Sequence, residues 1–155
     1  MIGFLTGKII SSKPTQILLD VNGVGYTVNI SINTFEKISE KETVSLFIHT
    51  SVKEDSITLF GFFTQSEKEM FELLISISGI GPKLGLNILS GIVVDDLKSA
   101  ISNGNVSRLI AIPGIGRKTA ERVVLELRNK VDAIKADGVI KETSAKDEAI
   151  SALTT

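Results

Sequence analysis

The chain has 155 residues and a formal net charge of −1, and 43% of its residues are hydrophobic, which is enough for one large or two small domains with well-filled cores. It has no cysteine and one histidine, which excludes disulfides, thiol catalysis and Cys/His zinc sites. The start lacks a charged leader with an apolar segment, and no apolar run is long enough to span a membrane. We therefore expect a cytoplasmic protein.

Residues 1–63 are predicted to form a small β-barrel. Asn22-Gly23 is typical of a two-residue hairpin, and five short strands with one helical insertion favour a closed barrel of the OB type. We expect strands over 1–11, 16–21, 25–32, 43–52 and 56–62, with a helical turn within 32–38. Most of the aromatic residues are expected to be core rather than base-stacking groups: Phe4, Tyr26, Phe35, Phe47, Phe60, Phe62 and Phe63.

The turn between the last two expected strands carries two adjacent carboxylates, Glu54 and Asp55. Two acids alone are a weak indication of a magnesium site. A solvated hairpin tip is the simpler interpretation. A third interpretation is that the negative charge repels DNA phosphates.

Residues 64–131 change to helical periodicity and are predicted to form a compact five-helix domain. Ser66 and Glu69 have the spacing of a capping box. Residues 64–130 carry 9 basic and 7 acidic side chains, so the basic excess of the chain is confined to this domain. The remaining helices are expected over 84–90, from a cap at Asp95 or Asp96, from Asn105, and over 117–131 with an i,i+4 pair between Glu126 and Lys130.

One short sequence motif occurs twice in this domain. Gly79-Ile80-Gly81-Pro82-Lys83 returns 35 residues later as Gly114-Ile115-Gly116-Arg117-Lys118, which indicates a duplicated helix-hairpin-helix unit. Glycines permit a positive φ and close approach, and the amides at a following helix start, with a nearby lysine, make an anion site. Two such sites would hold two stretches of sugar-phosphate backbone without reading bases.

Other glycine motifs fit less well. A dinucleotide-binding loop needs a preceding strand, but residues 67–77 look helical and Gly85 falls one place late; the P-loop pattern is absent. A pair of glycine helix caps in a bundle remains an alternative, which the duplication with a basic residue at the same offset disfavours.

Residues 132–146 are polar and are predicted to be a flexible linker. Residues 147–155 begin an amphipathic helix, and nine residues are too few for a domain. We therefore expect either the start of an incomplete third domain or a disordered end of the chain.

In this order, these features closely resemble the RuvA family, the DNA-binding subunits of the bacterial Holliday-junction branch-migration complex. The resemblance extends over nearly all of the chain and implies a non-catalytic protein that binds four-way junctions and holds them open and flat, in recombination and repair. The phrases that carry it are Met1-Ile2-Gly3, Val21-Asn22-Gly23-Val24-Gly25-Tyr26, Glu54-Asp55 before Leu59-Phe60-Gly61-Phe62, and both glycine hairpins up to Leu84 and Arg122.

The resemblance also implies site residues and partners. Gly79, Gly81, Lys83, Gly114, Gly116, Arg117, Lys118 and Arg122 would grip the DNA backbone, and Glu54 and Asp55 would form an acidic pin at the junction centre. Such proteins form tetramers, in some cases two face to face. Their third domain docks onto the hexameric ATPase RuvB, and the RuvC resolvase is a further partner. No cofactor is expected in this chain, since ATP and magnesium belong to the motor.

Two other function classes compete with a junction binder. A helix-hairpin-helix glycosylase or nuclease would need a catalytic acid or lysine, and Asp132, the nearby acid, falls in the polar tail. His49 lies in an apolar strand and is expected to be structural. A single-strand binder of the OB type would need more free aromatics.

Overall fold

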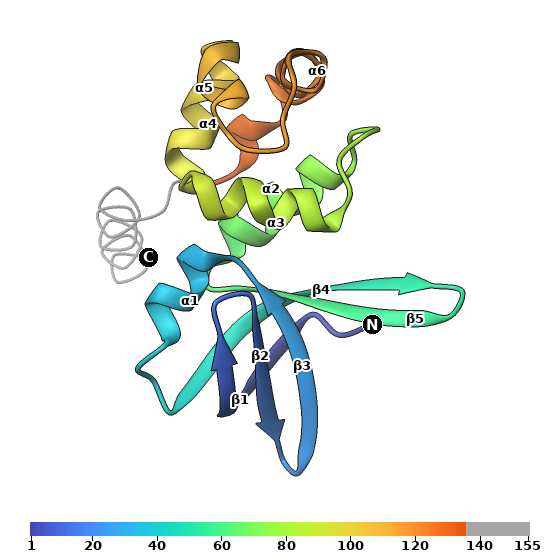
Figure 1. Cartoon of the computed structure of the whole chain (residues 1–155), viewed down its shortest axis with the longest axis vertical. Helices are drawn as coiled ribbons and strands as arrows, with labels where there is room; N and C mark the ends of the chain where they lie inside the picture. The colour runs from blue at the N-terminus through green and yellow to red at the C-terminus, as the bar shows by residue number, and fades with distance from the viewer. Residues whose placement is uncertain (136–155) are drawn as a thin grey trace, which may run out of the picture.

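A computed structural model describes residues 1–135 of the chain, which form a β-barrel and a helical domain beside it (Figure 1). The expected third domain at 147–155 and most of the expected linker lie outside the described residues.

The barrel is closed by five strands in the order β1-β2-β3-β5-β4. Neighbouring strands are antiparallel except β3 and β5, which are parallel. A short helix, α1 (Ile32–Ile38), joins β3 to β4, so the OB-type barrel is confirmed. The strands are β1 (Phe4–Lys13), β2 (Gln16–Val21), β3 (Val24–Ile30), β4 (Thr43–Lys53) and β5 (Ser56–Phe62).

The β2–β3 connection has the predicted geometry, with Asn22 at φ 52° and Gly23 at φ 90°, and both angles are positive as a type I′ turn requires. The expectation for the aromatics is confirmed only in part. Phe60 and Phe62 are buried, whereas Phe4 is half exposed and contacts Phe47 edge-on, with ring centroids 5.1 Å apart. Phe4 lies on the outer face of the barrel, because strand side chains alternate between its two faces.

The helical domain contains five α-helices and one short 3₁₀ helix within the described residues. Its core is built from aliphatic side chains such as Leu74, Ile88, Leu97 and Val123. The helices are α2 (Gln65–Ile75), α3 (Pro82–Gly91), α4 (Val94–Ser102), α5 (Val106–Ile110), α6 (Arg117–Leu127) and η1 (Val131–Ala133).

Three helix starts in this domain were expected from capping side chains, and two of these three were wrong. The capping box of α2 is formed by Thr64 and Glu67, since the Thr64 side chain accepts from the Glu67 amide, while the Ser66 hydroxyl donates to the carbonyl of Lys135. Helix α4 begins at Val94, two or three residues earlier than a cap at Asp95 or Asp96 would allow, so both acids lie in its first turn. Only the cap at Asn105 is confirmed; it accepts from the Arg108 amide.

The last helix is shorter than expected. Helix α6 ends at Leu127, so Lys130 lies beyond it and Glu126 is paired with Arg122 instead, at 3.6 Å. Val131 and Ile134 are buried against the helical core. That core therefore extends into the segment assigned to the linker.

The barrel and the helical domain share a packed boundary. Phe60 and Phe62 at the end of β5 belong to the helical core, and their rings lie 5.3 and 4.9 Å from that of Phe71 in α2. His49 Nδ1 of β4 lies 2.8 Å from Glu72 Oε2 of α2, which supports the structural role expected for this histidine. The two domains are thus held in a defined relative position.

Candidate nucleic-acid interface

The two predicted hairpins have nearly the same backbone. Gly79 and Gly114 have φ of +99° and +94°, and each is followed by a buried isoleucine, Ile80 or Ile115. The isoleucine amide bonds three residues back, to Ile77 O at 3.0 Å or to Ile112 O at 3.2 Å. The duplication in sequence is therefore a duplication in geometry.

The second glycine of each hairpin, Gly81 or Gly116, is not required by its backbone angle. Gly81 and Gly116 are the N-caps of α3 and α6, with φ of −90° and −89°, which any residue can adopt. A Cβ placed on either would meet nothing within 4 Å. Neither the backbone angle nor packing inside this chain requires glycine here, which leaves open space for a ligand against the backbone.

The helix starts that follow are suited to anions. Neither α3 nor α6 has a side-chain cap, so the amides of the first turn point outward without an acceptor from the cap residue. Pro82 occupies the first helical position of α3, two residues before the expected start at 84, and its missing amide costs nothing there. Outward amides and the helix dipole together favour a phosphate or carboxylate at these two places.

The predicted cations surround the two helix starts. Lys83 and Lys118 are at least partly exposed. The Arg117 side chain is 75% exposed and lies 3.9 Å from Glu121, one turn further along α6. Arg122 is also near, but its guanidinium donates from Nη1 to Ser78 O at 3.2 Å. The hairpins are therefore adjacent in space.

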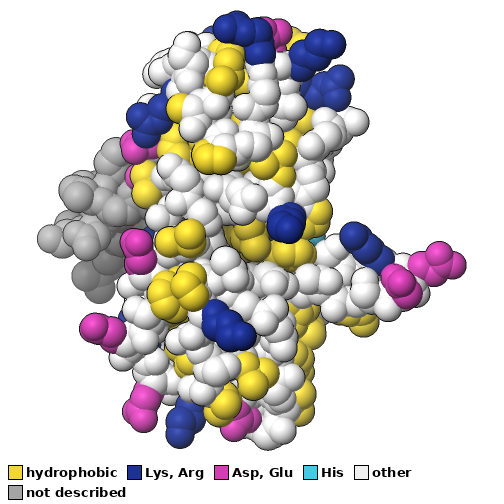
Figure 2. All heavy atoms as spheres, viewed as in Figure 1, with side chains coloured by type: hydrophobic (Ala, Val, Ile, Leu, Met, Phe, Trp, Pro, Cys, Tyr) yellow, Lys and Arg dark blue, Asp and Glu magenta, His cyan; other side chains and the backbone are white. Residues whose placement is uncertain are grey.

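The predicted acidic pair lies apart from the hairpins. Glu54 and Asp55 form the two-residue turn between β4 and β5, beyond the paired residues Lys53 and Ser56. The hairpin formed by β4 and β5, here called the arm, projects from the barrel toward the same side as the α2–α3 hairpin (Figure 1). Both acids are exposed at the tip of the arm (Figure 2).

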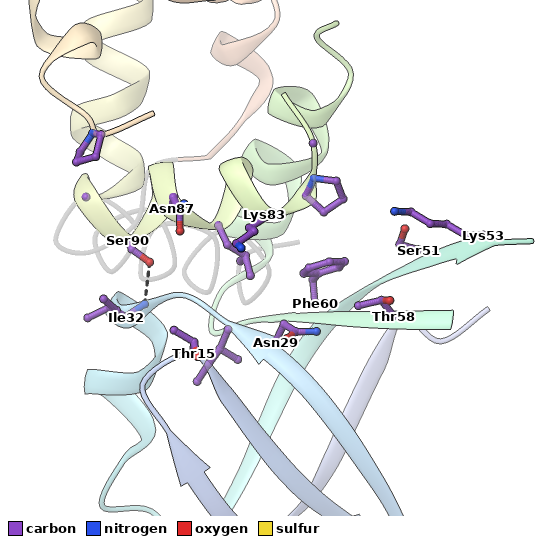
Figure 3. A pocket seen from close by; sticks show the side chains of 16 residues that line it. Thr15, Asn29, Ile32, Ser51, Lys53, Thr58, Phe60, Lys83, Asn87 and Ser90 are labelled. Atoms are coloured by element: carbon purple, nitrogen blue, oxygen red, sulfur yellow. Dashed lines mark hydrogen bonds between the residues drawn. The ribbon is translucent and has the colours of Figure 1, made fainter. Parts of the chain in front are cut away.

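A cleft lies between the arm and the first hairpin. Its volume is about 810 Å³, and Phe60, Leu86 and Pro82 form apolar parts of its wall. Lys53 and Lys83 approach it from opposite sides, and they are the charged residues among those that line it (Figure 3). The basic hairpin and the acidic arm are thus separated by a cleft whose charged lining residues are both positive.

Glu67 is an important residue that pattern reading did not single out. It is 4% exposed, yet its carboxylate lies near Thr64 Oγ1, Thr34 Oγ1 and Lys37 Nζ, at 3.2, 3.4 and 3.6 Å. It therefore ties α2 to α1 of the barrel. The Thr-x-x-Glu spacing at 64–67 was a usable signal, but it overlaps the similar Ser66–Glu69 pattern.

Within the described residues no group of three or more histidine or acidic side chains is placed to hold a metal. None of the helices of residues 1–135 combines the length and apolar character that crossing a membrane requires.

Two family models match the chain. The RuvA N terminal domain matches residues 1–61, and the SAM-like helix-hairpin-helix tandem matches residues 71–129. The first match covers the barrel, and the second covers the helical domain from the middle of α2 to just beyond the end of α6.

Several curated proteins that bear the name Holliday junction branch migration complex subunit RuvA are similar to this chain. The protein of Geobacter sulfurreducens is 58% identical over 132 residues, covering 84% of this chain and 66% of that protein. Those of Pelobacter propionicus and Geotalea daltonii are each 51% identical, covering 90% and 99% of this chain and 71% and 81% of their own lengths. The chain belongs to the RuvA family.

Proposed function

We propose that this chain binds four-way junction DNA through its backbone, independently of sequence, and holds the junction open for branch migration. The observation that carries the proposal is the pair of adjacent hairpins with the same geometry. Each presents uncapped helix amides, a glycine with open space and a lysine. Amides and lysines recognise phosphates, which every DNA sequence shares.

The proposed contacts are those expected from the sequence. Gly79, Gly81 and Lys83 would hold one backbone stretch, and the second hairpin would hold another. The second set comprises Gly114, Gly116, Arg117, Lys118 and Arg122. Because one chain offers two adjacent sites, several copies arranged around a junction would grip all of its arms.

Glu54 and Asp55 are proposed to act by repulsion at the junction centre. Their carboxylates stand at the end of a projecting arm. Negative charge there would push apart phosphates that approach the crossover and would favour separated strands. This role takes the place of the solvated tip as the preferred interpretation.

The chain is proposed to be non-catalytic, with motor activity supplied by an ATPase partner. Four copies would surround one junction, or eight copies in two facing tetramers. Contact with the RuvB ATPase would be made by the third domain, and the RuvC resolvase would act on the held junction. A cytoplasmic location accords with these partners.

A gel-shift competition between a synthetic four-way junction and a linear duplex of the same sequence tests the proposal. Run in EDTA at moderate salt, with light scattering on the free protein, it should show strong junction preference by a tetramer-sized particle. Equal affinity for both DNAs by a monomer would contradict the proposal. Cleavage of labelled junction or damaged duplex by the protein alone would contradict the non-catalytic role.

A further inference from the structure

Each glycine hairpin is held by a side chain from the helix that follows the other hairpin. Arg122, in the second turn of α6, donates from Nη1 to the carbonyl of Ser78, directly before Gly79, at 3.2 Å. In the reverse direction, Leu84 of α3 packs on the second hairpin, where a Cβ on Gly114 would be only 2.8 Å from Leu84 Cδ1. The two contacts join both hairpins into one unit.

The Arg122 guanidinium is also oriented by its own helix. Its Nε lies 3.6 Å from Glu126 Oε2, one turn further along α6. Donors on both sides of the planar group thus face protein oxygens, at Glu126 and at Ser78. Because the donors of the planar guanidinium have a fixed geometry, a guanidinium bonded on both sides fixes the position of the first hairpin relative to α6.

The polar bridge is present on one side of the repeat only. The offset of 35 residues that relates Gly79 to Gly114 relates Ser78 to Pro113 and Arg122 to Asn87. Asn87 and Pro113 both line the cleft of about 810 Å³. The first hairpin is therefore bridged to α6 by Arg122, while the equivalent pair of positions borders open space.

We infer that Arg122 is a positioning residue that sets the separation of the two phosphate sites. The inference deepens the proposed function and rests on it, because a fixed separation matters only if both hairpins grip DNA. Two sites held at the right spacing bind one ligand more tightly than two independently moving sites, since less ordering is left to the binding step.

Hydrogen exchange on the free protein tests this inference without DNA. In Arg122→Gln we expect exchange of the hydrogen-bonded amides at the first hairpin, those of Ile80 and Gly85, to rise about threefold to tenfold, as loss of one hydrogen bond predicts. Arg117→Gln is the matched control. It removes a cation and an i,i+4 pair from the same helix, and its partner Glu121 lies on α6 itself, so the first hairpin should keep wild-type exchange.

Leu84→Ala tests the reciprocal contact and should raise exchange of the hydrogen-bonded amides of Ile115 and Ala120 at the second hairpin. Unchanged exchange of the first hairpin in Arg122→Gln would overturn the inference. So would an equal rise throughout α2 and the barrel, because it would show a general loss of stability. Junction preference of the wild-type protein is measured separately, so failure of the proposed function is distinguishable from failure of this inference.

Discussion

The four glycines of the hairpins serve two different physical ends. Gly79 and Gly114 are needed by the chain itself, because their φ of +99° and +94° is unfavourable for L side chains. Gly81 and Gly116 have ordinary backbone angles and nothing within 4 Å of a built Cβ. Substitutions at the second pair can therefore separate binding from folding.

Gly116→Ser should weaken junction binding without loss of stability. Serine is a good N-cap, and its hydroxyl would accept from the amides that a phosphate needs. We expect the free energy of unfolding to be unchanged or to rise by about 0.5 kcal/mol. We expect junction affinity to fall about tenfold, by competition for these donors. Urea unfolding and gel shift measure the two effects.

Asn105→Ser is the matched control for that variant. It exchanges one good N-cap for another on α5, whose cap already accepts from Arg108. Stability and junction affinity should both stay near the wild-type values. Full junction affinity in Gly116→Ser would remove the second helix start from the DNA contacts.

Lys118→Ala should weaken binding equally for all sequences. Its exposed ammonium sits beside the start of α6, and each lost phosphate contact lowers the slope of log affinity against log salt by about 0.9. A salt titration of junction binding measures this slope. An unchanged slope would mean that Lys118 contacts no phosphate.

At the scale of elements, the β4–β5 arm carries its charge beyond the last strand pair. The register places Lys53 opposite Ser56, so Glu54 and Asp55 alone form the turn. A turn this short holds both carboxylates at the end of a regular two-stranded arm. The two carboxylates can therefore repel phosphates at a place away from the body of the barrel.

The double substitution Glu54→Gln and Asp55→Asn should leave junction affinity unchanged or raise it, while impairing strand separation at the crossover. Removing two negative charges removes repulsion of the phosphates. A fluorescent base analogue at the crossover reports strand separation. Glu40→Gln with Glu42→Gln makes the same charge change at exposed residues elsewhere on the barrel. A large affinity loss confined to the arm variant would indicate a metal-binding or structural role instead.

At the scale of the whole molecule, the relation between the domains depends on a buried carboxylate. Glu67 serves as the capping-box acid of α2 and also reaches Thr34 and Lys37 of α1. The phenylalanine cluster across the same boundary supplies apolar contact. The arm and the hairpins belong to different domains, so this boundary determines where the acidic tip stands relative to the phosphate sites.

Glu67→Ala should destabilise the protein by about 2–3 kcal/mol, because it removes the capping-box acid of α2 and leaves the buried Thr34 hydroxyl without its carboxylate partner. Denaturant unfolding measures the loss. Glu69→Ala is the matched control, two positions along the same helix and partly exposed; its cost should be below about 1 kcal/mol. Equal costs for both would contradict the assignment of the capping box to Thr64 and Glu67.

Local patterns were sufficient for much of this protein. The Asn22-Gly23 turn, the five strands, the duplicated hairpins and the Asn105 cap all follow from short-range rules on turns, alternation and capping, so the sequence alone determined them. The predicted caps of α2 and α4 and the predicted end of α6 were wrong. At α2, Thr64 and Ser66 offer nearly equal signals. Helix α4 follows Val93, which has no capping side chain, and α6 ends at Leu127 without a local stop signal, so packing and not a local pattern sets these two boundaries.

Only the tertiary structure decided how distant residues meet. The bridge from Arg122 to Ser78 spans 44 positions, and the contact of Glu67 with Thr34 spans 33. Such contacts depend on how whole helices pack, and packing sums many weak interactions that no local pattern records. The sequence by itself determined two glycine hairpins suited to phosphate and an acidic turn. The tertiary structure placed the hairpins side by side and set the acidic arm across a cleft from them.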